Sequence, residues 1–345
     1  MRRGQIGIAM SGGVDSTACA IMLQKDHPVQ GFFMRLAQPD YDSQLERVQE
    51  IAGRLGIGLT VVDLQRQFEE KVLEYFAGSY RLGLTPNPCL VCNREIKFGL
   101  LLQAMLASGS ETMATGHYAR IVERDGVFSL HKGLDRKKDQ SYFLARLGQA
   151  QLGRLLLPLG DWNKKATYTL VADHGFMGFS GSESQDVCFL GSESVGDFLA
   201  RRLPGMTADG PVVTVDGKEI GRHRGLFRHT IGQRRGLGLP DSTPWYVVRL
   251  DPESNTLIVG KEDDLLQWQV EIADLHWPGG NPPGDGERFE VRLRSTHRGA
   301  SATCHPAGDN RARLHFDSAQ RAVTPGQFAV LYRNDEVFGS GVICR

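Results

Sequence analysis

The sequence reads Ser11-Gly12-Gly13-Val14-Asp15-Ser16 directly after an apolar run over residues 5–10, and this stretch decides the expected fold. A helical pattern over residues 15–25 follows it. At a helix start, free backbone N–H groups and the helix dipole attract an anion. Gly12 and Gly13 carry no Cβ, so a phosphate can approach the backbone closely. The stretch therefore predicts a nucleotide-phosphate loop between a first strand and a first helix.

The same alternation continues along the first part of the chain. Strand-like runs cover residues 5–10, 29–36, 59–64 and 111–115, and helical patterns cover residues 15–25, 42–55, 65–80 and 95–107. Strands separated by helices of this length are typical of βαβ units, which build a parallel sheet with ligand-binding loops at the carboxyl ends of its strands. We expect an α/β domain over residues 1–196.

After about residue 196 the sequence pattern changes. Short strand-like runs punctuated by Gly and Pro predict a small β-rich central domain over residues 197–268. Alternating runs at 289–293, 311–316, 328–332 and 337–343 predict an antiparallel β-barrel over residues 269–345. A length of 345 residues agrees with more than one domain.

Composition restricts the class of protein. No apolar run reaches the roughly 18 residues needed to cross a bilayer, so we expect a cytoplasmic protein without a membrane partner. Six cysteines are too few for a disulfide framework. The 40 basic and 40 acidic residues cancel, yet residues 218–235 are locally basic and are predicted to meet phosphates.

The phosphate loop belongs to neither of two common types. It lacks the Gly-Lys-Ser/Thr ending of a Walker A loop and the Gly-x-Gly-x-x-Gly of a dinucleotide site. The hydroxyls of Ser11 and Ser16 are candidate donors, and Asp15 is expected to orient the loop or to hold Mg²⁺. A plain Gly-Gly turn capped by serine is the alternative. The loop resembles the PP-loop of the N-type ATP pyrophosphatases, which implies that ATP activates a substrate as its adenylate.

The cysteines separate into two groups. Cys89 and Cys92 stand at a predicted helix start near Arg94 and Lys97, which predicts a lowered pKa and partial thiolate character for Cys92. Zinc is disfavoured because it needs four ligands and no second Cys-x-x-Cys exists. Cys188 follows in a polar, turn-like segment. The other three, Cys19, Cys304 and Cys344, are expected in packing positions.

Taken together, the motifs resemble those of the tRNA-specific 2-thiouridylases over nearly the whole chain. Besides the loop and the cysteine segments 86–99 and 184–189, the match rests on residues 115–118, 138–144, 225–234 and 324–327. The resemblance implies a PP-loop domain of the adenine nucleotide alpha hydrolase type and ATP-dependent 2-thiolation of a wobble uridine in tRNA.

The resemblance also implies a mechanism. ATP would adenylate the C2 oxygen of the uridine, releasing pyrophosphate, and AMP would then leave as sulfur attacks C2. Cys188 would carry the persulfide, received from a sulfur-donor protein, and Cys92 would release its sulfur through a transient Cys92–Cys188 disulfide.

Site residues carried over from the family fall into three sets. The ATP set is Ala9, Met10, Ser11, Gly12, Gly13, Val14, Asp15, Ser16, Met34 and Gly116; Asn87, Pro88 and Cys89 would meet the target base; His117, Lys138, Asp139, Gln140, Arg292, Leu293 and Gln327 would contact tRNA. Three of these assignments have ordinary alternatives: Met34 as a core residue, His117 as a structural histidine, and residues 136–138 as a solvated charged turn.

One position departs from the family pattern. Many relatives carry Asp where this chain has Cys89, so the acid–base role of that carboxylate is not carried over. Cys89, Cys92 and Cys188 could instead ligate an iron–sulfur cluster. Two other functions stay open: another PP-loop adenylating enzyme, such as a tRNA thiolase acting at a different nucleotide or an amide-forming synthetase, and a non-catalytic RNA-binding protein.

Overall fold

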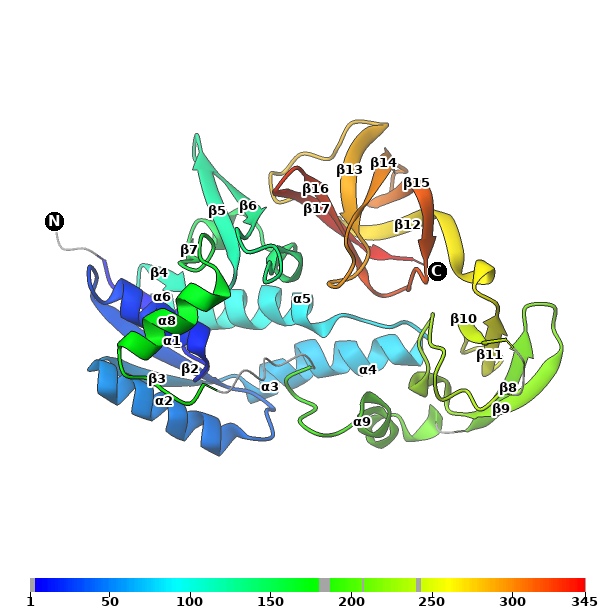
Figure 1. Ribbon diagram of the computed structural model, residues 1–345, viewed down its shortest axis with the longest axis horizontal. Helices are drawn as coiled ribbons and strands as arrows, with labels where there is room; N and C mark the ends of the chain where they lie inside the picture. The colour runs from blue at the N-terminus through cyan, green and yellow to red at the C-terminus, as the bar shows by residue number, and fades with distance from the viewer. Residues whose placement is uncertain (1–3, 180–186, 207, 240–242, 345) are drawn as a thin grey trace.

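The computed structural model describes residues 4–179, 187–206, 208–239 and 243–344. Figure 1 shows three parts: a parallel sheet with helices near the N-terminus, a small four-stranded sheet at the lower right, and a β-barrel above it. None of the helices in these ranges is long and apolar enough to span a bilayer.

The first part is built on a five-stranded parallel sheet in the order β3-β2-β1-β4-β7. Its strands are β1 (Ile6–Ala9), β2 (Val29–Arg35), β3 (Gly58–Asp63), β4 (Thr112–Ala114) and β7 (Leu155–Leu156). Each neighbouring pair runs parallel. The α/β domain with a parallel sheet is therefore confirmed.

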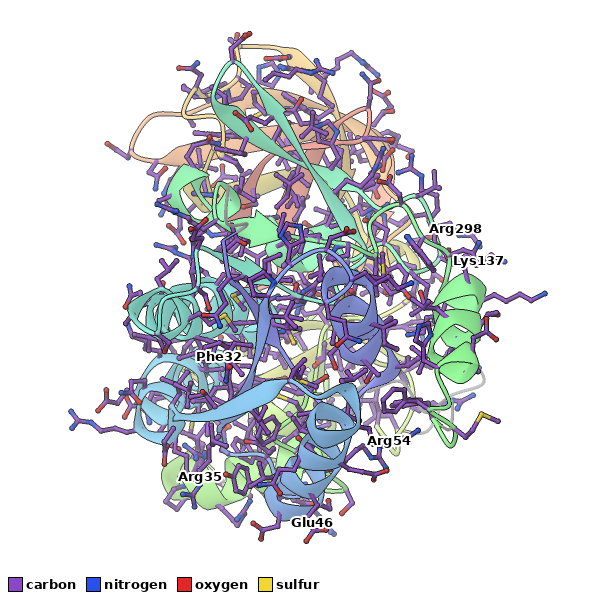
Figure 2. The ribbon with its side chains drawn as sticks, turned by 90° about the vertical axis from the view of Figure 1, so that its left-hand side faces the viewer. Phe32, Arg35, Glu46, Arg54, Lys137 and Arg298 are labelled. Atoms are coloured by element: carbon purple, nitrogen blue, oxygen red, sulfur yellow. The ribbon has the colours of Figure 1, made fainter. Side chains whose placement is uncertain are left out.

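Helices cover both faces of this sheet. Successive residues of a strand point to opposite faces, so each face has its own set of side chains to bury. Phe33 packs with α1 (Val14–Leu23), α2 (Tyr41–Leu55) and α8 (Lys164–Asp173). Its neighbour Phe32 packs on the other side. Figure 2 shows Phe32 inside the molecule, whereas Glu46 and Arg54 lie on the exposed side of α2.

Two long helical segments cover the face on which Phe32 lies. The first consists of α3 (Gln65–Phe68), a π-helical turn η1 (Glu69–Leu73) and α4 (Glu74–Arg81). The second consists of α5 (Pro88–Cys92), the π-helical η2 (Asn93–Leu101) and α6 (Leu102–Ala107). This second segment begins at Pro88, ahead of the helical pattern from residue 95 and where the cysteine motif predicted a helix start, because Asn87 caps it and Pro88 occupies its first turn.

The four-stranded sheet forms a separate small body with its own apolar core. It has the order β10-β11-β8-β9, with β8 (Asp209–Thr214), β9 (Glu219–Arg224), β10 (Tyr246–Asp251) and β11 (Thr256–Gly260). The helix α9 (Val195–Arg202) and the 3-10 turn η4 (Pro204–Met206) connect it to the first part, and the 3-10 turn η5 (Leu226–Arg228) follows β9.

The last part is a closed antiparallel barrel, as predicted. Its strands are β12 (Leu266–His276), β13 (Glu287–Arg292), β14 (Ala300–Pro306), β15 (Arg311–Arg321), β16 (Phe328–Arg333) and β17 (Glu336–Ile343). Their order is β12-β15-β14-β13-β16-β17, and pairing of Ile272 with Ile343 joins the first strand to the last. A 3-10 turn η6 (Asp263–Leu265) precedes the barrel.

A hairpin from the first part extends this barrel sheet. Its strands, β5 (Ala119–Arg124) and β6 (Val127–Lys132), add to the sheet through the pairing of His131 with Glu336. The following segment, with η3 (Ser141–Leu144) and α7 (Gln149–Leu152), also contacts the barrel: the Tyr142 hydroxyl donates to the Phe328 carbonyl at 2.9 Å. This hairpin was not predicted from the sequence.

Candidate active site

The phosphate loop lies between β1 and α1, where the sequence predicted it. Gly12 adopts a left-handed conformation with φ +75°, which favours glycine. Ser16 closes the loop on itself: its hydroxyl donates to the Gly13 carbonyl at 3.0 Å and accepts from the Ser11 N–H at 3.2 Å. Ser16 is buried. Its hydroxyl therefore shapes the loop, and the Ser11 hydroxyl is the more available donor.

Asp15 is held in place by a network that the sequence analysis missed. Both carboxylate oxygens accept from Lys164 Nζ, at 2.7 and 2.8 Å. The Tyr118 hydroxyl also contacts Asp15, at 3.0 Å, and Thr167, at 2.9 Å. Asp15 thus fixes the start of α1 against α8, which agrees with the predicted loop-orienting role. The only sequence signal for Lys164 was its place in the first turn of a helix capped by Asn163.

A pocket of about 190 Å³ opens above this loop. It is lined by Ala9, Met10, Ser11, Asp15, Ser16, Phe32, Met34, Lys97, Gly116, His117 and Gln140. Most residues predicted to bind ATP are therefore brought together, and Gly12, Gly13 and Val14 form the loop that supports them. At Gly116, an added Cβ would lie 2.7 Å from Asp15 Cβ, so only glycine fits there without a shift.

The start of the second helical segment positions two of the cysteines. Asn87 accepts from the Cys89 N–H through its side-chain oxygen at 3.2 Å, and Pro88 is buried beside it. Leu90 anchors the helix in the core. Cys92 lies one turn after Cys89, so both thiols lie on the same side of the helix.

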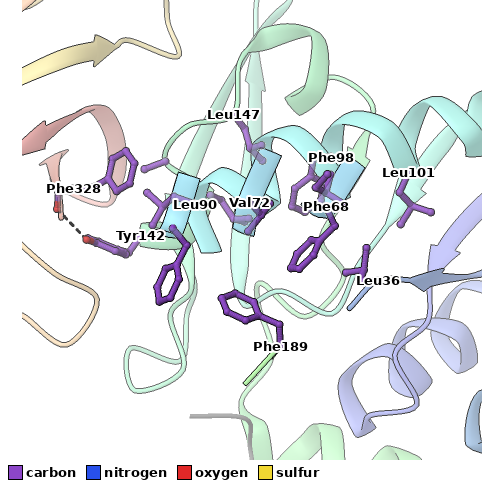
Figure 3. Packing of buried hydrophobic residues seen from close by; sticks show 14 of the residues in the cluster. Leu36, Phe68, Val72, Leu90, Phe98, Leu101, Tyr142, Leu147, Phe189 and Phe328 are labelled. Carbon is purple, nitrogen blue, oxygen red and sulfur yellow. Dashed lines mark hydrogen bonds between the residues drawn. The ribbon is translucent and has the colours of Figure 1, made fainter. Parts of the chain in front are cut away.

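Cys188 reaches the same region because its neighbour is an anchor. Phe189 is buried among aromatic rings, with centroids 5.9 Å from Phe68, 5.3 Å from Phe76 and 5.1 Å from Phe198. Figure 3 shows Phe189 below Phe68 and Val72 in this cluster. Cys188 itself is exposed in a turn, as predicted. Residues 184–186 of its motif lie outside the described residues.

The three cysteines line one pocket of about 290 Å³. Its lining is Phe68, Val72, Pro88, Cys89, Cys92, Asn93, Lys97, His117, Gln140, Phe143, Val187, Cys188 and Phe189. Three of these residues, Lys97, His117 and Gln140, also line the pocket above the phosphate loop. The two pockets therefore meet, and chain segments far apart in the sequence bring a phosphate loop next to three thiols.

The predicted thiolate character of Cys92 is wrong for this structure. Burial raises the pKa of Cys92 to about 12, and the charge of Lys97 opposes this only in part. Burial likewise raises the pKa of Cys89 to about 11, and it raises the pKa of Cys188. Arg94 forms an ion pair with Glu95 at 3.2 Å. For Cys89 and Cys92, removal of the thiol from water outweighs its place at a helix start.

His117 has the contacts of a structural histidine, and it also lies at both pockets. Its Nδ1 lies 2.7 Å from the Thr115 hydroxyl, and its ring packs 5.5 Å from Phe98. Burial holds the pKa of His117 well below its ordinary value, so the ring is neutral at physiological pH. At the same time it lines both pockets. Gln140 is similarly fixed, because its side-chain oxygen accepts from the Tyr118 N–H at 3.0 Å.

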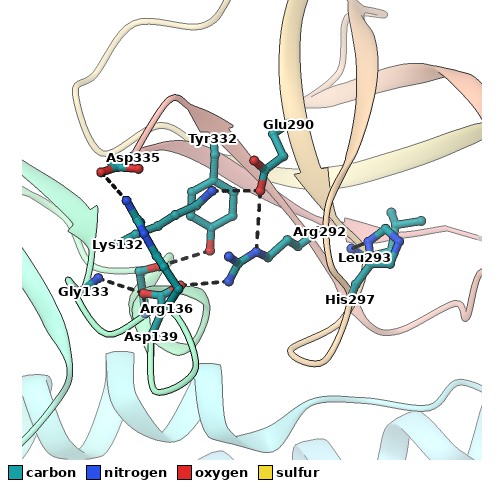
Figure 4. Close-up of polar contacts among 11 residues, drawn as sticks. Lys132, Gly133, Arg136, Asp139, Glu290, Arg292, Leu293, His297, Tyr332 and Asp335 are labelled. Carbon is teal, nitrogen blue, oxygen red and sulfur yellow. Dashed lines mark hydrogen bonds and ion pairs between the residues drawn. The ribbon is translucent and has the colours of Figure 1, made fainter. Parts of the chain in front are cut away.

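The remaining residues predicted to contact tRNA lie where the first part meets the barrel. Arg292 Nη1 donates to Asp139 Oδ2 at 2.8 Å, and the Asp139 side chain is 1 % exposed. Figure 4 shows this pair beside the ion pair of Lys132 with Glu290. Leu293 is buried, and Gln327 donates to the Thr85 carbonyl at 2.9 Å. Neither these four nor Lys138 lines the two pockets, and their tRNA contacts stay predictions.

The locally basic segment forms part of the four-stranded domain. Arg222, Arg224 and Arg228 line a cavity of about 350 Å³ there. Arg228 also pairs with Asp197 at 3.1 Å. A phosphate contact at this surface stays a prediction.

The predicted packing cysteines are only partly confirmed. Cys19 and Cys304 are fully buried in apolar clusters. Cys344 is partly exposed instead and lines a cavity of about 480 Å³ between the barrel and β10, which corrects the expectation for it. The strand ends at Ile343, so Cys344 lies beyond the packed core.

The side chains do not form a ready metal site. Within the described ranges, no three His, Cys, Asp or Glu side chains lie close enough together to hold a metal ion, so the geometry does not support an iron–sulfur cluster on Cys89, Cys92 and Cys188. Asp15 is the only carboxylate among the described residues that line the nucleotide pocket. Mg²⁺ commonly binds through one or two carboxylates and substrate phosphates. Both oxygens of that carboxylate accept from Lys164, and a magnesium ion that arrives with the nucleotide stays a prediction.

Comparison with known proteins covers the chain almost end to end. Family models match residues 4–192 ("tRNA methyl transferase HUP domain"), 196–261 ("tRNA methyl transferase PRC-barrel domain") and 268–343 ("Aminomethyltransferase beta-barrel domain"). A "tRNA-specific 2-thiouridylase MnmA" from Desulfotalea psychrophila is 52 % identical over 98 % of both chains. The chain belongs to the tRNA-specific 2-thiouridylase family. Members with the same name from Chloroflexus aurantiacus (98 % of both chains) and Burkholderia pseudomallei (99 % of this chain, 94 % of that one) are each 40 % identical to it.

Membership confirms the resemblance that the motifs predicted. In this chain the phosphate loop and Cys188 are separated by more than 170 residues, and the fold places both at adjoining pockets.

Proposed function

We propose that this protein catalyses ATP-dependent 2-thiolation of the wobble uridine of tRNA. The observation that carries the proposal is that the nucleotide pocket and the thiol pocket adjoin through Lys97, His117 and Gln140. A base activated by ATP in one pocket would then face sulfur held in the other. Family membership supports the same reaction.

In the first step, the C2 oxygen of the uridine bonds to the α-phosphorus of ATP, and the bond to the bridging oxygen breaks to release pyrophosphate. The loop residues bind the phosphates through backbone N–H groups and the Ser11 hydroxyl. Mg²⁺ bound to the nucleotide would neutralise part of the phosphate charge. Asn87 and Pro88 would border the base, beside Cys89.

In the second step, the terminal sulfur of a Cys188 persulfide bonds to C2, and the C2–O bond breaks to release AMP. The Cys92 thiolate attacks the Cys188 sulfur, which breaks the S–S bond and leaves sulfur on C2. A Cys92–Cys188 disulfide results, and an external thiol must reduce it before the next cycle. The exposed position of Cys188 suits its loading by a persulfide-bearing donor protein.

Nucleoside mass spectrometry tests this function directly. Wild-type enzyme with ATP, tRNA and a persulfide source should yield 2-thiouridine and one AMP for each thiolated base. Cys188→Ala should abolish 2-thiouridine while ATP and tRNA binding persist, whereas Cys344→Ala, outside both pockets, should retain activity. Retained thiolation by Cys188→Ala would remove Cys188 from the mechanism, and a thiolated base at another position would favour a different tRNA thiolase. AMP formation without tRNA would favour a synthetase.

A further inference from the structure

Lys97 occupies an unusual place for a cation. It lies on η2, is partly buried, and lines both the nucleotide pocket and the thiol pocket. Within the described part of the chain, no carboxylate forms an ion pair with it. The other nearby cations differ: Arg94 pairs with Glu95 at 3.2 Å, and Lys71 with the same carboxylate at 3.4 Å.

A partly buried ammonium without a counter-ion is costly, because it loses water without gaining a partner. Lys97 is the only Lys or Arg among the described residues that line the two pockets. Its neighbour His117 is neutral. Lys164 lies near the loop, but its ammonium is held by Asp15. The junction of the pockets thus carries one positive charge, from Lys97.

The charge of Lys97 lies at both the thiol pocket and the nucleotide pocket. It stabilises the anionic forms of all three thiols, Cys89, Cys92 and Cys188, against the effect of burial. On the other side it lines the nucleotide pocket together with Ser11 and Gly116. An anion in either pocket would therefore interact with the same ammonium group.

We propose that Lys97 is an anion-binding catalytic residue shared by the two steps of the reaction. This inference rests on the proposed function and adds a residue to it. The ammonium binds the α-phosphate oxygens while the C2–O bond forms and later breaks, and it stabilises the Cys92 thiolate that attacks Cys188. The protons of the persulfide and of Cys92 leave to water.

Two variants and one control separate this role from a structural one. Lys97→Met removes the charge and keeps most of the length, Lys97→Arg keeps a charge, and Arg94→Gln changes an exposed cation on the same helix that lines neither pocket. Circular dichroism and thermal unfolding show whether each variant folds as the wild type does.

The first measurement is the alkylation rate of Cys92 by iodoacetamide at pH 8, without ATP or tRNA. Lys97→Met should slow it on the order of tenfold, because loss of the Lys97 charge raises the pKa of Cys92 further and a rise of about one unit leaves about tenfold less thiolate at pH 8. Lys97→Arg should restore the rate to within about threefold. The second measurement, tRNA-dependent AMP release, should fall about 100-fold or more in Lys97→Met. Arg94→Gln should match the wild type in both.

Wild-type alkylation of Cys92 together with wild-type AMP release in a folded Lys97→Met variant would overturn the role of Lys97. Failure of the proposed function gives a different pattern: the wild type itself would form no 2-thiouridine. The alkylation result does not depend on tRNA, so the two failures are distinguishable.

Discussion

Replacing Asp139 with Asn should weaken the attachment of the barrel to the first part of the chain. The Asp139 carboxylate is 1 % exposed and lies 2.8 Å from Arg292, whose side chain is 14 % exposed. It also accepts from the N–H groups of Gly133 and Ser141, both at 3.1 Å. Removing one partner of a buried pair costs about 3–5 kcal/mol. Because an amide oxygen can still accept from both N–H groups, we expect the lower end, about 3 kcal/mol.

Hydrogen–deuterium exchange of β13 and β16 measures this local stability. A loss of about 3 kcal/mol corresponds to roughly 150-fold lower protection in Asp139→Asn. The double variant with Arg292→Met also removes the buried cation. Its loss of local stability should therefore be smaller than the sum of the two single-variant losses by at least about 2 kcal/mol. Asp317→Asn is the control, because its pair with Arg288 is exposed and should contribute under about 1 kcal/mol. Additive single losses, or equal effects of Asp139→Asn and Asp317→Asn, would refute the reasoning.

Three further predictions follow from the site and its surroundings. Gly116→Ala should lower ATP affinity about tenfold in calorimetry, because the new methyl group would lie 2.7 Å from Asp15 Cβ. Peptide mapping should find iodoacetamide on exposed Cys188 before Cys92, whose alkylation rate should rise about tenfold per pH unit from about pH 8 to 10, because its pKa is raised to about 12. Burial lowers the pKa of His229 to about 4 from an ordinary value of 6.5, so the unfolded chain binds this proton in that window and the native chain does not. Thermal stability should therefore decline as pH falls from 6.5 towards 4, and His229→Gln should reduce the decline; equal slopes would contradict this origin.

Local patterns were enough to predict the parallel sheet, the phosphate loop and the closed barrel. The loop Ser11–Ser16 needs only a strand before it and a helix after it, and both are visible as runs of apolar periodicity. The barrel strands likewise show alternating side chains. Nothing local, however, indicates that Asp139 pairs with Arg292, because 153 residues separate them.

The site was predicted less fully than the fold, and the reason is burial. Neighbours in sequence suggested that Arg94 and Lys97 would both favour a Cys92 thiolate, but Arg94 points to Glu95 and the thiol itself is removed from water. The anchoring of Cys188 by Phe189 depends on rings of two other helical segments. Such contacts between distant segments decide the pKa of a thiol, and a motif does not record them.

The β5–β6 hairpin belongs to the first part of the chain but pairs with the barrel sheet, so the two parts are not separate in space. Cutting after residue 196 would strip β6 of its neighbour β17 and leave Lys132, only 6 % exposed, without the Glu290 carboxylate. An uncovered strand edge beside an uncompensated cation invites aggregation. The barrel therefore protects this strand edge, and an isolated fragment of residues 1–196 should be poorly soluble even though it carries all the described residues that line the two pockets.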